Sequence, residues 1–287
     1  MDSQKNFTPS FSCEFFPPRT DKGRVNLQQT LDSLAPLKPA YISCTYGAGG
    51  STQEGTSETV KMILDKGIEA AAHITCIGST RSKIHELLSH YQQMGVRRLV
   101  ALRGDLPQGQ DRAGEFLFAN ELVSFIRAEF SDSFHIEVAA YPEMHPQASN
   151  INDDLHHFAS KVNAGANAAI TQYFFNIDAY LRFVDDCEKL GLAIPVVPGI
   201  MPITNYTQLA RFSEGCGAEI PRWLATRLQA YGDDLESIRA FGIDVITRLC
   251  EALLSAGAPG LHFYTLNRAE PTTTIWKHLG LSELMHG

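Results

Sequence analysis

The segment that decides the fold spans residues 70–102 and reads A-A-A-H-I-T-C-I-G-S-T-R-S-K-I-H-E-L-L-S-H-Y-Q-Q-M-G-V-R-R-L-V-A-L. A short apolar run at 70–77 is followed by an amphipathic stretch at 82–94, which stops at Gly95, and by a second apolar run at 97–102. Short apolar runs are typical of buried strands, and a glycine after a periodic stretch is typical of a helix C-terminus. The segment therefore predicts a strand, a helix and a second strand.

The same alternation continues along the chain. The predicted strands are 10–16, 41–45, 70–77, 97–102, 135–140, 168–173, 195–200 and 261–266. The predicted helices lie near 24–35, 53–66, 82–94, 115–130, 151–164 and 177–190, and Ser51 and Glu54 have the spacing of a capping box. Such alternation requires parallel strands with helical crossovers, and eight units favour a closed (β/α)8 TIM barrel. The connection 201–260, between the seventh and eighth strands, is long enough for about three extra helices.

An open doubly wound sheet is the alternative architecture. Such a sheet usually carries a glycine-rich dinucleotide-binding turn after its first strand, whereas residues 14–20 read E-F-F-P-P-R-T. The sequence shows no linker-like change in composition, internal repeat or low-complexity tract. We therefore predict one barrel domain over residues 1–287.

The composition indicates a globular protein, with 44% hydrophobic residues, 24 basic residues and 32 acidic residues, for a net charge of −8. The chain is too hydrophobic to be disordered, and its negative charge argues against nucleic acid or an anionic membrane as the main partner. No apolar run approaches the roughly 20 residues of a membrane span, and the N-terminus lacks an apolar signal-peptide core. We therefore expect a cytoplasmic protein with small-molecule partners.

The cysteines are widely spaced and form no C-x-x-C pair; they are Cys13, Cys44, Cys76, Cys187, Cys216 and Cys250. This pattern predicts buried free thiols and gives no support to a metal site or a catalytic cysteine.

Polar residues follow nearly every predicted strand at its C-terminal end, which is where such barrels carry their active sites. These residues are Glu14, Thr45, Tyr46, His73, Arg103, Gly104, Asp105, Tyr141, Glu143, His145, Gln172, Asn267 and Arg268. Their recurrence at one edge indicates a site for a polar small molecule. Taken singly, each also has a structural interpretation: Arg103 and Asp105 could pair with each other, and His73 could be a core histidine.

Two groups point to the chemistry of the site. Glu14 lies in an apolar run, and a carboxyl group in apolar surroundings can serve as a general acid near neutral pH. Asp154, His157 and Lys161 are spaced to share one helix face, which could be solvated or could face an anionic ligand such as a phosphate. The sequence contains no metal-ligand cluster and no phosphate loop, so we expect acid–base catalysis with an organic cofactor.

Six runs in this sequence resemble the methylenetetrahydrofolate reductase family: C-E-F-F-P-P-R-T, T-Y-G-A, A-L-R-G-D-L-P, A-A-Y-P-E-M-H-P, A-I-T-Q-Y-F-F-N and H-F-Y-T-L-N-R-A-E. They occur in order between about residues 11 and 281. The resemblance implies a flavoprotein barrel that reduces 5,10-methylenetetrahydrofolate to 5-methyltetrahydrofolate for methionine synthesis. NADH or NADPH reduces FAD and leaves, and folate then binds in its place, a ping-pong order.

The resemblance also implies roles for individual residues. Glu14 matches the general acid that protonates the folate, and Asp105 matches the aspartate beside flavin and pterin. Gln172, Tyr206 and Arg268 match folate-binding positions, as Asp105 does. Thr45, Gln172 and Tyr206 match positions that bind the nicotinamide. The positions that match FAD-binding residues are Thr45, Tyr46, Ala48, His73, Arg103, Gly104, Asp105, Ala119, Tyr141, His145, Ala148, Asp154, His157 and Lys161.

Three positions depart from a bacterial member of the family. His157 replaces an asparagine, Ser160 replaces an arginine, and Tyr206 replaces a phenylalanine that lines the shared substrate site. We expect weaker FAD binding from the loss of charge at Ser160, and a hydrogen-bond partner for the Tyr206 hydroxyl. Long eukaryotic members add a C-terminal regulatory domain that binds S-adenosylmethionine, and we expect none here.

Three other functions remain as alternatives: a flavin barrel of the proline-dehydrogenase type, a pterin-binding transferase without flavin, and a non-catalytic binding module. The first would explain the cofactor but not Glu14 together with Gln172. No basic cluster for a 2′-phosphate is evident, and short bacterial members favour NADH, so we favour NADH over NADPH. The family also implies a homo-oligomer, either a dimer or a tetramer.

Overall fold

A computed structural model describes residues 1–46, 53–105 and 114–284 of the chain. The strands are β1 Ser10–Phe15, β2 Ile42–Cys44, β3 Ala70–Thr75, β4 Arg98–Leu102, β5 His135–Ala140, β6 Ala168–Thr171, β7 Val196–Val197, β8 Gly199–Ile200 and β9 Gly260–Tyr264. The helices up to β7 are α1 Asp21–Leu34, α2 Gln53–Asp65, α3 Arg81–Gln93, α4 Ala119–Phe130, α5 Ile151–Asn163 and α6 Ile177–Lys189, with 3-10 helices at Gln4–Asn6 and Ala35–Leu37. The helices after β8 are α7 Tyr206–Cys216, α8 Arg222–Ala230, α9 Leu235–Ala256, α10 Glu270–His278 and α11 Leu281–Leu284.

The strands form one sheet in the order β7-β6-β5-β4-β3-β2-β1-β9-β8. Successive pairs from β1 to β5 are parallel, as is the pair β8–β9. The two strands that end this order, β7 and β8, are separated in the chain only by Pro198, which has no N–H to give to a strand ladder. The strand order therefore returns to its starting point, which confirms the predicted (β/α)8 barrel class. The helices α7, α8 and α9 confirm the prediction of extra helices before the last strand.

Element boundaries differ from the predictions where a local interaction decides them. The helix predicted at 115–130 begins at Ala119, because Glu121 accepts hydrogen bonds from the backbone N–H groups of Leu117 and Phe118. The last strand ends at Tyr264 and not at residue 266, because Leu266 and Asn267 have φ angles of 51° and 55°. The Ser51 position of the predicted capping box lies outside the described residues, as do Gly47 to Gly50.

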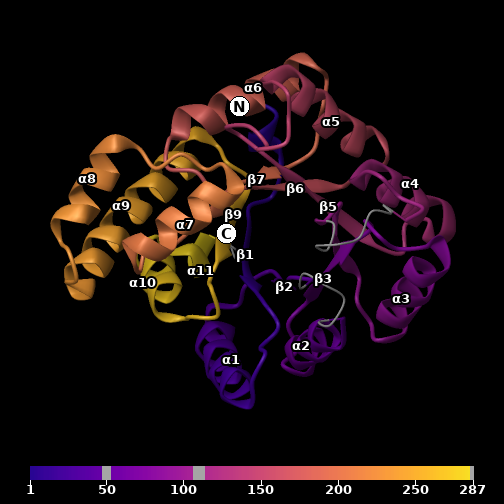
Figure 1. The fold of residues 1–287 in the computed structure, drawn as a ribbon, viewed down its shortest axis with the longest axis horizontal. Helices are drawn as coiled ribbons and strands as arrows, with labels where there is room; N and C mark the ends of the chain where they lie inside the picture. Colours follow the sequence, from indigo (N-terminus) through magenta and orange to yellow (C-terminus); the bar gives the residue numbers. More distant parts are fainter. Residues whose placement is uncertain (47–52, 106–113, 285–287) are drawn as a thin grey trace. The chain divides into compact units, whose positions relative to one another are not determined.

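The chain divides into two compact units. Unit 2 comprises Ser12–Ala139 and Ser160–Ala169. Its helices α2, α3 and α4 each follow a strand, and Figure 1 shows them on the outer side of β2 to β4. A polar layer is buried beside the N-terminal ends of these strands: Glu137 accepts from the Tyr41 hydroxyl and from Arg98 Nη1, each at 2.7 Å. Pairing on both oxygens offsets the cost of burying the Glu137 carboxylate.

Unit 1 comprises Met1–Phe11, Ala140–Ala159 and Ile170–Gly287. Its N-terminal segment and its last strand are joined, since Ser10 N donates to Pro259 O at 3.0 Å. At Gly260, where φ is 129°, an added Cβ would lie 1.8 Å from Ser10 O, so only glycine fits there. In α9, a Cβ on Gly242 would lie 2.6 Å from Ile203 O, which shows how closely this helix approaches the 201–204 segment.

Five of the six cysteines are buried free thiols, as predicted. Cys216 is only half-buried, so the prediction of burial is wrong at this position, which is the last residue of α7. Within the described parts of the chain, no helix is both long and apolar enough to cross a membrane.

Candidate active site

In unit 2, Glu14 near the end of β1 and His73 on β3 approach each other, with 3.4 Å between Glu14 Oε2 and His73 Nε2. The two side chains are 18% and 6% exposed. Cys13 and Phe15, the neighbours of Glu14 in the chain, are completely buried, and they belong to the opposite face of the strand. Glu14 is thus a reachable carboxyl group held beside an imidazole, which is an arrangement suited to moving a proton.

The end of β2 lies next to β1. Thr45 N donates to Phe15 O at 2.9 Å, and Thr45 O accepts from the Thr56 hydroxyl at 3.0 Å. Tyr46 is half-buried, and burial raises the pKa of its phenol. The backbone of Thr45 is therefore fixed near Glu14. Ala48, which we predicted to contact FAD, lies outside the described residues.

The end of β4 supplies Arg103, Gly104 and Asp105. Arg103 Nε donates to Leu117 O at 3.0 Å, which joins this end to the residues just before α4 and Ala119. Gly104 has a φ of 78°, and an added Cβ would lie 2.7 Å from the Thr75 Cβ. A larger residue would clash with Thr75, so this position requires glycine. Asp105 is exposed.

In unit 1, the loop between β5 and α5 orders a histidine. His145 N donates to Asp154 Oδ2 at 2.7 Å, and His145 Nδ1 accepts from Gln147 N at 3.0 Å. Because Nδ1 accepts, the hydrogen of the neutral ring lies on Nε2. Tyr141 packs edge-on to this ring, with 4.5 Å between ring centroids. The loop therefore presents a fixed hydrogen-bond donor, while Ala148 lies further along it, half-buried.

The polar face predicted on α5 is divided in the structure. Asp154 is half-buried and bound to the loop, whereas His157 and Ser160 are exposed. Lys161, in unit 2, donates from Nζ to Ala139 O at 2.5 Å. The three predicted residues thus have different surroundings: His157 faces solvent, and Lys161 is directed to the end of β5.

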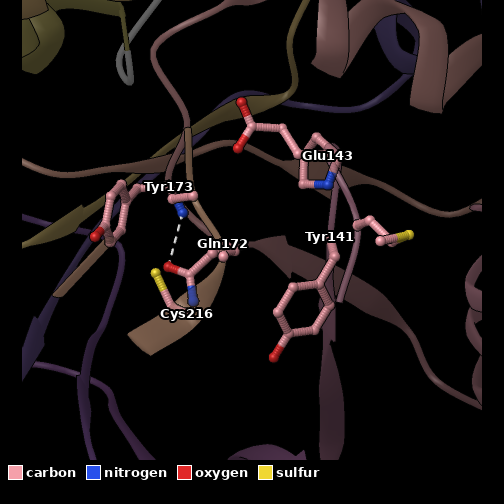
Figure 2. A pocket seen from close by; sticks show the side chains of 9 residues that line it. Tyr141, Glu143, Gln172, Tyr173 and Cys216 are labelled. Atoms are coloured by element: carbon pink, nitrogen blue, oxygen red, sulfur yellow. Dashed lines mark hydrogen bonds between the residues drawn. The ribbon is translucent and has the colours of Figure 1, made fainter. Parts of the chain in front are cut away.

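A small pocket in unit 1 is lined by two of the predicted strand-end residues, Tyr141 and Gln172. Figure 2 shows it lined also by Glu143, Tyr173 and Cys216. The Gln172 Oε1 accepts from Tyr173 N at 3.0 Å, which fixes the amide beside Cys216. The Glu143 carboxylate points away from the Tyr141 hydroxyl and accepts from Glu219 N at 2.7 Å. Burial raises the pKa of Glu143.

Tyr206 and Arg268 are the remaining predicted substrate residues. Tyr206 begins α7, and its hydroxyl accepts from Gln229 Nε2 at 2.9 Å, which is the partner that the sequence required. Arg268 is exposed and follows two residues with left-handed backbone, a conformation that costs free energy outside glycine. The bond from Arg268 N to Thr265 O, at 3.0 Å, closes this strained turn.

The sequence did not single out Tyr173, Cys216 or the role of Glu143. Glu143 stood among the strand-end residues, and its spacing gave no hint of a bond to Glu219, which is 76 residues away. Cys216 belongs to a helix C-terminus, where no strand-end rule applies. Only the packing of α7 on the β5 and β6 ends brings these groups to the pocket.

Each unit by itself offers donors that suit FAD, the cofactor that the resemblance implies. FAD carries an anionic pyrophosphate and many acceptor atoms, and Arg103, Lys161 and the Nε2–H of His145 are donors for such groups. Within the described residues, no group of three or more His, Cys, Asp or Glu side chains could hold a metal ion.

Comparison with known proteins adds independent findings. The family model described as Methylenetetrahydrofolate reductase matches residues 1–280. The chain is 41% identical over 271 residues to the 5,10-methylenetetrahydrofolate reductase of Escherichia coli (strain K12), which covers 94% of this chain and 90% of that protein. It is 39% identical to the "Probable methylenetetrahydrofolate reductase (NADH)" of Oryza sativa subsp. japonica over 95% of this chain, and it spans 48% of that longer protein.

Two solved structures show the same kind of fold at low identity. One is described as "Uncharacterized protein from Clostridium thermocellum binds two copies of 5-methyl-5,6,7,8-tetrahydrofolic acid", with a TM-score of 0.68, 18% identity and 99% of both chains covered. The other is oxaloacetate acetylhydrolase in complex with oxalate, with a TM-score of 0.52 and 11% identity, covering 96% of this chain and 80% of that one. Identities this low show the fold alone.

Proposed function

Because the chain belongs to the methylenetetrahydrofolate reductase family of oxidoreductases, we propose that it reduces 5,10-methylenetetrahydrofolate to 5-methyltetrahydrofolate with bound FAD and with NADH as the electron donor. The plant relatives named for NADH support this choice of nucleotide. The structural neighbour that binds 5-methyltetrahydrofolate supports a folate ligand. The product would serve methionine synthesis.

The observation that carries the proposal is the Glu14–His73 pair. The reaction needs a proton at N10 of the folate, so that the five-membered ring opens to a 5-iminium cation. Glu14 lies 3.4 Å from His73 Nε2 and is still 18% exposed, so it can deliver that proton to a bound molecule. When bound, FAD would accept a hydride from NADH and later donate a hydride to the folate. Asp105 then stabilises the positive charge on the folate by electrostatic attraction.

Other residues bind the cofactor and the substrates and orient them. We propose that Thr45, Tyr46, His73, Arg103, Gly104, Ala119 and Lys161 of unit 2, with Tyr141, His145, Ala148, Asp154 and His157 of unit 1, hold FAD, together with Asp105 and Ala48. In this proposal Gln172 and Tyr206 contact nicotinamide and folate in turn, Thr45 contacts the nicotinamide, and Arg268 binds the folate. Shared residues of this kind require a ping-pong order. We also propose a cytoplasmic homo-oligomer, a dimer or a tetramer, built from one catalytic domain.

A two-step absorbance experiment tests this function. The purified protein should be yellow and should release FAD on denaturation. NADH should bleach the flavin absorbance under anaerobic conditions, and 5,10-methylenetetrahydrofolate should then restore it with formation of 5-methyltetrahydrofolate. NADPH added at the same concentration should bleach it more slowly. Failure of the folate to restore the absorbance would contradict the proposal and leave a flavin oxidase of another type.

A further inference from the structure

Helix α7 connects two of the proposed substrate contacts. Its first residue is Tyr206, and its last residue, Cys216, lines the pocket together with Gln172. Any shift of α7 along or about its axis would therefore change the place of the Tyr206 ring relative to Gln172. The contacts that hold α7 in position are therefore important for substrate binding.

The C-terminal end of α7 is fastened by three contacts, all within unit 1. Glu219 N donates to Glu143 Oε2 at 2.7 Å, and the buried hydroxyls of Tyr173 and Ser213 are 3.0 Å apart. Gly217 has a φ of 75°, and an added Cβ would lie 2.9 Å from Pro146 Cγ. Two of these contacts reach the loop after β5, and the third reaches the end of β6.

Glu143 differs from the other two contacts because it is an ionisable group half-buried in a pocket wall. Burial raises its pKa, while the bond from Glu219 N and the charge of Arg182 oppose that rise. Burying a carboxylate costs free energy that a neutral acceptor would avoid. In return, a charge-assisted hydrogen bond to a backbone N–H is shorter and stronger than a neutral one. The side chain points away from the Tyr141 hydroxyl, so its contact is with the chain and not with the pocket interior.

We propose that Glu143 is a positioning residue for substrate binding: by holding the turn after α7, it fixes the helix whose first residue is Tyr206 relative to Gln172. This inference rests on the proposed function for its kinetic consequences. It assigns a role to a residue that the family motif alone left without one.

The other end of α7 shows how such an anchor reaches the ring. The Tyr206 hydroxyl accepts from Gln229 of α8 at 2.9 Å, so the ring is oriented by both helices. The turn that joins these helices, residues 217–221, contains Glu219. Releasing Glu219 from Glu143 therefore loosens the connection between the two helices that orient Tyr206.

The test compares two substitutions of Glu143 in the complete flavoprotein. Glu143→Ala removes the acceptor, and Glu143→Gln keeps an amide oxygen of similar position. Loss of one such bond should raise the KM for methylenetetrahydrofolate about 3- to 10-fold while kcat changes less than about 2-fold. Glu143→Gln should restore most of the affinity. Asp234→Ala is the matched control, because it removes a carboxylate-to-backbone bond, from Ser237 N at 3.0 Å, at the start of α9 in the same unit.

Hydrogen exchange at the Glu219 amide supplies a readout that does not depend on turnover. Glu143→Ala should speed this exchange, and Asp234→Ala should leave it unchanged. Equal KM values for wild type and Glu143→Ala would overturn the inference, as would unchanged exchange at Glu219. Equal losses in Glu143→Ala and Glu143→Gln would also overturn it, because they would show that the charge and not the anchor matters. A wild-type protein that exchanges as expected but fails to reduce the folate would instead contradict the proposed function.

Discussion

Two glutamates of unit 2 illustrate how environment separates roles at the scale of single residues. Glu137 has 3% of its side chain exposed and is held by Tyr41 and Arg98. Glu14 has 18% exposed and lies beside His73. A bound molecule can reach Glu14 but not Glu137. The first therefore suits chemistry, and the second suits the internal support of the strands.

Substitution of Glu14 by glutamine should separate the two half-reactions. The amide keeps the size of the side chain but cannot donate the proton, so folate reduction should fall at least about 100-fold. Flavin reduction by NADH needs no such proton and should stay near the wild-type rate. Stopped-flow absorbance measures both steps. Glu58→Gln, on an exposed carboxylate of α2, is the control, and an equal loss of both steps in Glu14→Gln would indicate a structural role instead.

At the scale of the elements, two glycines in helices of unit 1 should respond to alanine in opposite ways. Gly215 in α7 has open space where a Cβ would stand, so Gly215→Ala should stabilise the protein by about 0.5–1 kcal/mol through helix propensity. A Cβ added to Gly242 in α9 would lie 2.6 Å from Ile203 O, so Gly242→Ala should destabilise the protein by about 1–3 kcal/mol through overpacking. Urea unfolding midpoints measure both. If Gly242→Ala were also stabilising, α9 would not pack against the 201–204 segment as described.

The sequence predicted the elements well, because alternating strands and helices leave a strong periodic signal. It missed the end of the last strand, where Leu266 and Asn267 adopt left-handed conformations that their residue types do not favour. It also missed that the predicted strand 195–200 is interrupted at Pro198. Proline has no backbone N–H, and that donor is needed only for pairing within the sheet. Errors of this kind arise where pairing or backbone strain overrides local preference.

The site was less accessible to prediction than the fold. The strand-end positions include Glu14 and His73, which meet in unit 2, and Tyr141 and Gln172, which line one pocket in unit 1. No local rule could connect Glu143 to Glu219, or the Tyr206 hydroxyl to Gln229, since each pair joins segments far apart in the chain. Such long-range contacts, and the roles that depend on them, can be seen only in the folded structure.

At the scale of the whole molecule, the negative charge is unevenly shared. Unit 2 contains 14 basic and 15 acidic residues, for a charge of −1, while unit 1 contains 10 basic and 17 acidic residues, for a charge of −7. Folate and nucleotides are anions, so the proposed contacts in unit 1 must overcome a repulsive field. We therefore expect Arg268 to be important for attracting these anions to unit 1.

The whole protein should become less stable as the pH is lowered, because of His135. Burial, together with the charges of Arg98 and Arg127, lowers the pKa of His135 from 6.5 to about 4. The unfolded chain therefore binds a proton at this residue from pH 6.5 downward, while the folded chain stays neutral there until about pH 4. Acidification across this window favours unfolding. Urea titrations between pH 7 and 4.5 should show a steeper loss for wild type than for His135→Gln, and equal slopes would contradict this.

The pairing of β1 with β9 also determines when the sheet can be completed during synthesis. Ser10 leaves the ribosome early, but its partner Pro259 follows 249 residues later. Residues 12–139 of unit 2 can meanwhile collapse on nearby partners, whereas the first strand keeps an unpaired edge until Pro259 has been synthesised. Exposed edges of this kind attract other chains, and contacts so distant in sequence form slowly. We therefore expect the nascent chain to depend on chaperones until Pro259 and β9 have been synthesised.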